Sequence, residues 1–232
     1  MKIKCANAHH RRLRLMIWVL EWSQLLSIFQ SITTIGKMGS LNEQLFAAIE
    51  SGKVEEVATL LKNGASVNAK DSQDRPALMV AAQNGYTGIV KLLLRKGAKV
   101  DAKDAQGRTA LIKAASLGKV HIVKALLDKK AKIDARDGSG WTPLMWAAEL
   151  GKWDVAKLLI SKGADINAKD KQGWTPLVHA FAEFRLDGAK LLVSKGAKAS
   201  ITDKYTYSPL NLMMKLGDKK TTKLVEDAKF IE

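Results

Sequence analysis

The chain has 232 residues and is strongly basic, with 38 Lys and Arg against 23 Asp and Glu and a formal net charge of +15. Its single cysteine, Cys5, excludes a disulfide framework and a thiolate metal site from the rest of the chain. The composition is typical of a soluble interaction protein, and the charge favours acidic partners.

Residues 1–37 form a leader that does not share the pattern of the rest. A basic segment, 1–14, precedes an apolar stretch, 15–35. Glu21 interrupts this stretch, which makes a transmembrane span a poor fit, and a secretory signal would lack an Ala-x-Ala-like cleavage site. An amphipathic helix that binds a membrane surface or a partner is a further alternative. Translation could also begin at Met38, in which case the leader would not exist.

Downstream of the leader, one sequence pattern recurs every 33 residues. Self-similarity at this length predicts stacked supersecondary units, each of which buries its apolar face only against its neighbours. The clearest markers are a glycine after the first helix of each unit and an aspartate at its end. These are Gly52, Gly85, Gly118, Gly151 and Gly217, with Phe184 as the exception, and Asp71, Asp104, Asp137, Asp170 and Asp203.

The clearest copy of the repeat begins at Gly140. It reads Gly-Trp-Thr-Pro-Leu-Met-Trp-Ala-Ala-Glu-Leu-Gly over residues 140–151 and Asp-Val-Ala-Lys-Leu-Leu-Ile-Ser-Lys-Gly-Ala-Asp over residues 154–165. This pattern strongly resembles an ankyrin repeat. The resemblance implies an all-α solenoid of helix-turn-helix units with hairpin-like turns, which binds partner proteins and is rarely an enzyme.

The period divides one elongated domain, residues 38–232, into six units. The first and last units are expected to be caps, because one face of a terminal repeat meets water. No linker rich in Pro, Gly or Ser interrupts the domain. The units are 41–71 (cap), 72–104, 105–137, 138–170, 171–203 and 204–232 (cap).

Residues at the helix ends support the same interpretation. Thr142 can cap a helix with its hydroxyl, and Pro143 suits the first helical position, where its missing N–H costs nothing. Ala147 and Ala148 leave room for close helix packing. The second helices are expected to end in left-handed glycine caps at Gly97, Gly163 and Gly196.

Several positions depart from the family pattern. Lys130 stands where a capping glycine is expected, which should strain the backbone by about 1 kcal/mol. Phe184 replaces the helix-ending glycine, so we expect an irregular loop around Phe181 and Phe184, through drift compensated by a core phenylalanine or as a recognition feature. The histidine of the family's first turn is also replaced, so that apolar packing should substitute for a polar network between turns. The replacing residues are Met79, Ile112, Met145, Val178 and Asn211.

Two lysine positions recur on the predicted second helices. Neighbouring units stack at about 8–10 Å, close to the Debye length near physiological salt, so the like charges tolerate one another. The two ladders indicate either a solvated convex face or an electropositive ridge for acidic proteins or anionic lipid. Nucleic acid is not expected as a partner, because no aromatic side chains are interleaved. The ladders are Lys91, Lys124, Lys157, Lys190 and Lys223, and Lys96, Lys129, Lys162 and Lys195.

The opposite side, made of turn tips and first helices, is where ankyrin-like domains usually bind. Trp, Tyr and Arg dominate binding hot spots, which makes the aromatic residues predicted there the clearest functional signal. An alternative is that Trp141 and Trp174 pack over the neighbouring turn, and Trp153 is expected to be structural. The turn column comprises Arg75, Arg108, Trp141, Trp174 and Tyr207. The first-helix column comprises Val80, Lys113, Trp146, His179 and Leu212.

No catalytic, metal-binding or phosphate-binding motif occurs, and His121 and His179 stand alone on their predicted helices. We therefore expect a non-catalytic, monomeric scaffold or adaptor without cofactor or metal, which binds an acidic and apolar protein surface. A cytoplasmic location is expected, with membrane association or export only through residues 1–37. If so, the leader and the lysine ladders would hold the protein on anionic lipid.

Overall fold

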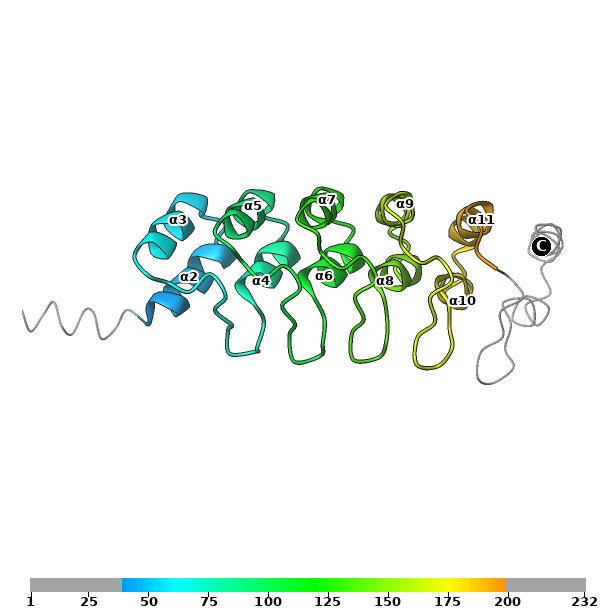
Figure 1. The fold of residues 1–232 in the computed structure, drawn as a ribbon, viewed down its shortest axis with the longest axis horizontal. Coiled ribbons are helices and arrows are strands. Elements are labelled where there is room, and N and C mark those ends of the chain that lie inside the picture. The colour runs from blue at the N-terminus through cyan, green and yellow to red at the C-terminus, as the bar shows by residue number, and fades with distance from the viewer. Residues whose placement is uncertain (1–38, 199–232) are drawn as a thin grey trace, which may run out of the picture.

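The computed structural model describes residues 39–198, in which consecutive α-helices form pairs joined by loops (Figure 1). One isolated backbone bridge, between Lys70 and Pro76, closes the first long loop. The predicted leader, the last unit, Tyr207 and Leu212 lie outside the described residues. The helices are α2 Leu41–Glu50, α3 Val54–Lys62, α4 Ala77–Asn84, α5 Thr87–Arg95, α6 Ala110–Ser116, α7 Val120–Asp128, α8 Pro143–Glu149, α9 Trp153–Ser161, α10 Pro176–Ala182 and α11 Leu186–Ser194.

The helix pairs form two layers. In Figure 1 the first helices, α2, α4, α6, α8 and α10, lie in one row beneath the second helices, and the loops between pairs project below them. Each helix packs against its partner, and the first helices pack against one another along the whole stack. Among the second helices, α9 and α11 contact each other less closely than the preceding pairs. The predicted all-α solenoid of tandem units is confirmed.

The helix ends match the residues that predicted them. The hydroxyls of Thr142 and Thr175 accept the backbone N–H groups three residues later, at 3.3 and 3.4 Å. Pro143 and Pro176 occupy the first positions of α8 and α10. The left-handed caps after α5, α9 and α11 are confirmed by the φ angles of Gly97, Gly163 and Gly196, which run from 85° to 93°.

Some non-glycine residues share this left-handed backbone. Lys130, at φ 61°, does so as expected. The predicted irregularity around Phe184 is wrong, because at φ 54° this residue reproduces the turn that Gly151 makes at 63°. Its N–H donates to the Phe181 carbonyl at 3.0 Å, which keeps the loop regular. The Phe184 side chain is 68% exposed and Phe181 only 2%, so the strained residue stays outside the core.

The apolar interior runs between the two layers and along the stack. The paired alanines of α6 and α8 are fully buried, as close helix packing requires. Apolar packing also fills the positions of the family's histidine, as predicted, since Met79, Ile112, Met145 and Val178 are all buried. Trp153, at the start of α9, packs against both the core of the first units and that of the fifth, which supports its structural role.

Polar contacts nevertheless tie neighbouring turns together, which corrects the expectation that such a network is missing. At the turn tips, the Gly138 N–H donates to the Gln106 carbonyl at 2.8 Å, and the Arg136 guanidinium donates to the Lys169 carbonyl of the next unit. The acceptors of these bonds are backbone carbonyls, which every residue has. The absence of the family's histidines therefore does not predict whether such bonds form.

A second set of polar contacts links the loops that follow the second helices. In each unit an Asn or Asp side chain accepts the backbone N–H of the residue 31 positions later, at 2.8 to 3.1 Å. One such bond satisfies a loop donor of the next unit and fixes the spacing of the two units. We call this set the Asx ladder. Its bonds join Asn68 to Lys99, Asp101 to Lys132, Asp134 to Asp165 and Asn167 to Lys198.

Asp134→Asn should stabilise the protein at neutral pH. Burial, and then the nearby Asp165 carboxylate, raise the pKa of Asp134 despite the Asp165 N–H bond and Arg136. A carboxyl with a raised pKa costs stability once the pH exceeds its ordinary value. Asparagine keeps the bond without the charge, so the melting temperature should rise by about 1–3 °C at pH 7. Thermal unfolding followed by circular dichroism measures the shift.

The control for this substitution is Asp101→Asn, at the same position of the Asx ladder. Asp101 accepts the backbone N–H of Lys132, whose side chain is positively charged. Asp101 therefore lacks the like-charge repulsion that the Asp165 carboxylate exerts on Asp134. The two variants should differ at pH 7, and the gain at Asp134 should vanish as the pH falls below the ordinary carboxyl value, because the raised pKa of Asp134 then no longer costs stability. Equal gains in both variants would contradict the explanation.

Candidate protein-binding surface

Each long loop is built around the aspartate that closes the preceding unit. One carboxylate oxygen of this residue accepts the backbone N–H groups of the residues two and four positions later, at 2.8 to 3.0 Å. The aspartate thereby replaces a backbone acceptor within the turn. The residues that do so are Asp71, Asp104, Asp137 and Asp170.

The second oxygen of each aspartate is held by a predicted site residue. In the second and third units it is an arginine four positions later, with Arg75 Nε at 2.6 Å and Arg108 Nε at 2.8 Å. In the fourth and fifth units a tryptophan occupies that position. There a ring nitrogen of the first helix, nine positions after the aspartate, contacts the second oxygen instead. These contacts are Trp146 Nε1 at 2.9 Å and His179 Nε2 at 3.1 Å.

This structural role was missed from the sequence, although a signal was present. Where the turn residue is Arg75 or Arg108, the first-helix position carries no ring N–H group. Where the turn residue is tryptophan, that position carries Trp146 or His179. The exchange shows that each turn needs one donor to its aspartate, from either position. Four of the nine predicted partner-binding residues therefore also stabilise turns.

Two predicted site residues do not face solvent, which corrects the proposed first-helix column. Val80 is 1% exposed and belongs to the core, because a short apolar side chain at this position is covered by its neighbours. His179 is also 1% exposed. Its two ring nitrogens lie 3.1 Å from the carboxylates of Glu149 and Asp170, so it is committed within the protein.

The tryptophans form an aromatic patch on the turns and first helices of the fourth and fifth units. The ring centroids of Trp141 and Trp146 lie 4.6 Å apart, and His179 beneath them lies 4.0 Å from Trp141 and 5.4 Å from Trp174. All three indoles are half-buried rather than sunk in the core. Because His179 and their mutual contacts hold them, they present a rigid apolar surface.

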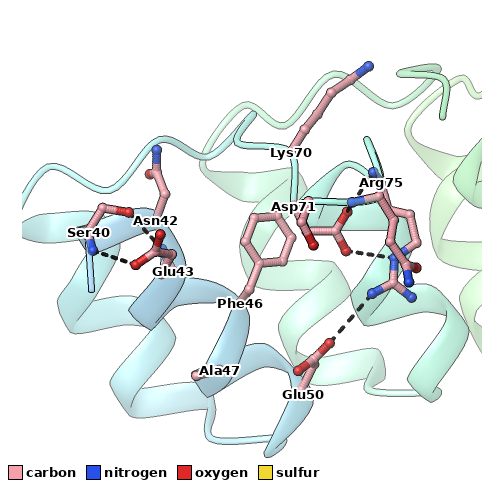
Figure 2. Close-up of a pocket in the computed structure, with 11 residues that line it drawn as sticks. Ser40, Asn42, Glu43, Phe46, Ala47, Glu50, Lys70, Asp71 and Arg75 are labelled. Atoms are coloured by element: carbon pink, nitrogen blue, oxygen red, sulfur yellow. Dashed lines mark hydrogen bonds and ion pairs between the residues drawn. The ribbon is translucent and has the colours of Figure 1, made fainter. Parts of the chain in front are cut away.

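A basic region adjoins this patch toward the N-terminal end of the stack. Arg75 lies across the loop from α2 and bridges Asp71 to Glu50, 3.6 Å away, at the edge of a hollow of about 840 Å³ (Figure 2). Burial alone would raise the pKa of Asp71, but hydrogen bonds from Arg75 and Gln73 hold it below its ordinary value. The Arg75 charge is therefore largely neutralised, and so is that of Arg108, which pairs with Asp104.

Lys113, on α6, differs from both arginines. Its side chain is half-buried, and no ion pair to it forms within residues 39–198. Burial, followed by the positive charges of Arg108 and Arg75, lowers its pKa, and Asp104 opposes this only in part. Lys113 is thus a partly desolvated cation among other cations, between the basic region and the aromatic patch.

We call Lys113, Trp141, Trp146 and Trp174, with Arg75 and Arg108 beside them, the aromatic-basic surface. In the part of the chain that the structure describes, no group of three His, Cys, Asp or Glu side chains could hold a metal ion. None of the helices described there has the length and hydropathy to cross a bilayer.

Comparison with known proteins agrees with this architecture. The family model described as ankyrin repeats matches the chain in three overlapping copies, at residues 36–104, 78–170 and 138–203. No curated protein matches the chain. Ankyrin repeats are typically protein–protein interaction modules and are usually without catalytic activity. With the stacked helix pairs and the capped Thr-Pro turns, this match over most of the chain shows that it belongs to the ankyrin repeat family.

Proposed function

We propose that the protein is a non-catalytic scaffold or adaptor that binds a partner protein through the aromatic-basic surface. The partner would present a carboxylate next to an apolar or aromatic side chain. The observation that carries this proposal is Lys113. A half-buried ammonium beside two arginines, without an ion-pair partner among residues 39–198, lowers the stability of the free protein.

A partner carboxylate would remove that cost, because it would provide the counter-charge that residues 39–198 do not supply. The adjacent indoles would take the apolar side chain. Trp141 and Trp146 need little ordering on binding, since their mutual contact already restrains both rings. Arg75 and Arg108 stay paired to aspartates and would contribute the positive field rather than direct bonds.

Lys113→Met should leave the fold at least as stable while weakening this binding about tenfold. A lysine with a lowered pKa disfavours the folded state when charged, so methionine should raise the melting temperature by about 1–2 °C at pH 7. The wild-type protein should regain this difference as the pH rises toward the ordinary lysine value of 10.5. Thermal unfolding at pH 7 and pH 10.5 measures both effects.

The function itself is tested by selecting a random 12-residue peptide library on the immobilised full chain. Enriched peptides should carry Asp or Glu next to Trp, Phe or Leu. Their affinity, measured by fluorescence anisotropy, should fall about tenfold in Lys113→Met and in Trp141→Ala. His121→Ala, at an exposed position of α7, is the control and should bind like wild type. Enrichment of basic peptides, or unchanged affinity in both variants, would refute the proposal.

A further inference from the structure

Two grooves on the second-helix side of the stack occupy equivalent positions of the repeat. One, of about 440 Å³, lies between α5 and α7, and the other, of about 690 Å³, lies between α9 and α11. Residues of the first groove recur 66 residues later in the second, which is two repeat lengths. Five residues that line the first groove are Lys91, Leu94, Arg95, Ala125 and Lys129, and their counterparts in the second are Lys157, Ile160, Ser161, Leu191 and Lys195. Val54, Gly88 and Asp128 also line the first groove, and Leu158 also lines the second.

Both grooves combine an aliphatic floor with cationic rims. In the second groove the floor is Ile160 and Leu191, which are partly buried, and exposed Lys157 and Lys195 stand on opposite rims. The helices α9 and α11 contact each other less closely than the earlier pairs, which leaves this floor open. The rims belong to the two lysine ladders, so one repeated pattern supplies the charge of both grooves.

The acidic side chains nearby do not neutralise these rims. On the rim of the second groove, Lys157 lies 3.8 Å from Asp154, in a pair whose side chains are mostly exposed. Exposed pairs at such distances contribute little and are readily exchanged for a better partner. Asp128 at the first groove opposes Lys91, Arg95 and Lys129, so positive charge dominates there too.

We propose that the two grooves together bind one acidic amphipathic helix of a partner protein, laid along the stack across the second helices. Charge complementarity selects an acidic ligand. The apolar floors lie between helices, below the level of the lysines, so they suit the protruding side chains of a helix. A flat bilayer surface would reach the ammonium groups before it reached the floors.

The separation of the grooves specifies the spacing of the anchoring residues. Two stacking steps of 8–10 Å place the grooves about 16–20 Å apart. An α-helix rises 1.5 Å per residue, so about 11 residues cover this distance, and they make close to three full turns. A helix with large apolar residues at positions i and i+11, flanked by Glu or Asp, would therefore present both anchors on one face.

The probe is a labelled 18-residue helical peptide with leucines 11 positions apart, glutamates beside each leucine, and alanine and glutamine elsewhere. Fluorescence anisotropy with the full chain should show saturable one-to-one binding that weakens about tenfold between 0.1 and 0.5 M NaCl. A second peptide, with its leucines seven positions apart, should bind about tenfold more weakly because only one groove is filled. The absence of saturable binding, or equal affinity of the two peptides, would overturn the proposal.

Variants locate the site and separate this proposal from the first. Lys91→Ser and Lys157→Ser, both at exposed positions, should each weaken the peptide about fivefold. Lys113→Met and Trp141→Ala on the other side should leave it unchanged. Unchanged affinity in both serine variants would overturn the assignment. So would binding of the chain to vesicles of phosphatidylcholine with phosphatidylserine when the peptide does not bind, because the ridge would then recognise lipid.

Discussion

Replacing His179 with alanine should lower the free energy of unfolding by about 3 kcal/mol. The imidazole lies between the carboxylates of Glu149 and Asp170, and the side chains of His179 and Asp170 are each 1% exposed. Without the ring, one oxygen of a buried carboxylate loses its donor, and a void opens beneath Trp141. Urea unfolding followed by circular dichroism at pH 7 measures the loss.

The matched control is His121→Ala, because this second histidine is exposed on α7. Its replacement should change stability by less than about 0.5 kcal/mol. If His179→Ala lowers the free energy of unfolding by less than about 1 kcal/mol, water must take the place of the ring and donate to the buried carboxylate. The buried contacts of His179 would then contribute little to stability, which would contradict the explanation.

The second large effect is expected at Gly188, within α11. At the same position of the earlier repeats stand Ile89, Ile122 and Val155, all fully buried. At Gly188, even a methyl group would overlap the indole of Trp153, which projects from the preceding unit. Gly188→Ile should therefore destabilise the protein by about 3 kcal/mol, although it restores the residue that the repeat favours.

The explanation is tested by a double-mutant cycle. Trp153→Val alone should cost about 2 kcal/mol, because it leaves a cavity over Gly188. Combined with Gly188→Ile, it recreates the packing of the earlier units, so the double variant should be more stable than either single variant. Gly88→Ala is the control for an added methyl group, since its nearest neighbour would be a Val54 methyl at 3.5 Å. Additive losses in the double variant would disprove the compensation.

The helices, their caps and the tandem order of the units could be predicted because each depends on residues close in sequence. Thr142 and Pro143 determine where α8 begins, whatever the neighbouring units contain. Phe184 was misjudged for the opposite reason. Its left-handed backbone is held by a regular hydrogen bond and by the burial of Phe181, and neither follows from the identity of residue 184.

The site could be predicted only in part, because the repeat places a side chain but does not say what covers it. Lys113, Trp146 and His179 share one repeat position, yet two are half-buried and His179 is fully buried. The difference comes from the neighbouring unit, whose Trp141 and Glu149 close over the histidine. The donor role of the arginines was missed for a simpler reason: the aspartates were regarded as repeat markers rather than as turn acceptors.

The Asx ladder has a consequence for how such a chain can change in length. Each of its bonds joins residues 31 positions apart, which lie in equivalent loops near the ends of two consecutive units. Copying or excising a whole internal unit recreates an intact junction on either side of the edit. Insertion or deletion of whole 33-residue units should therefore lengthen or shorten the stack while the remaining units keep their shape.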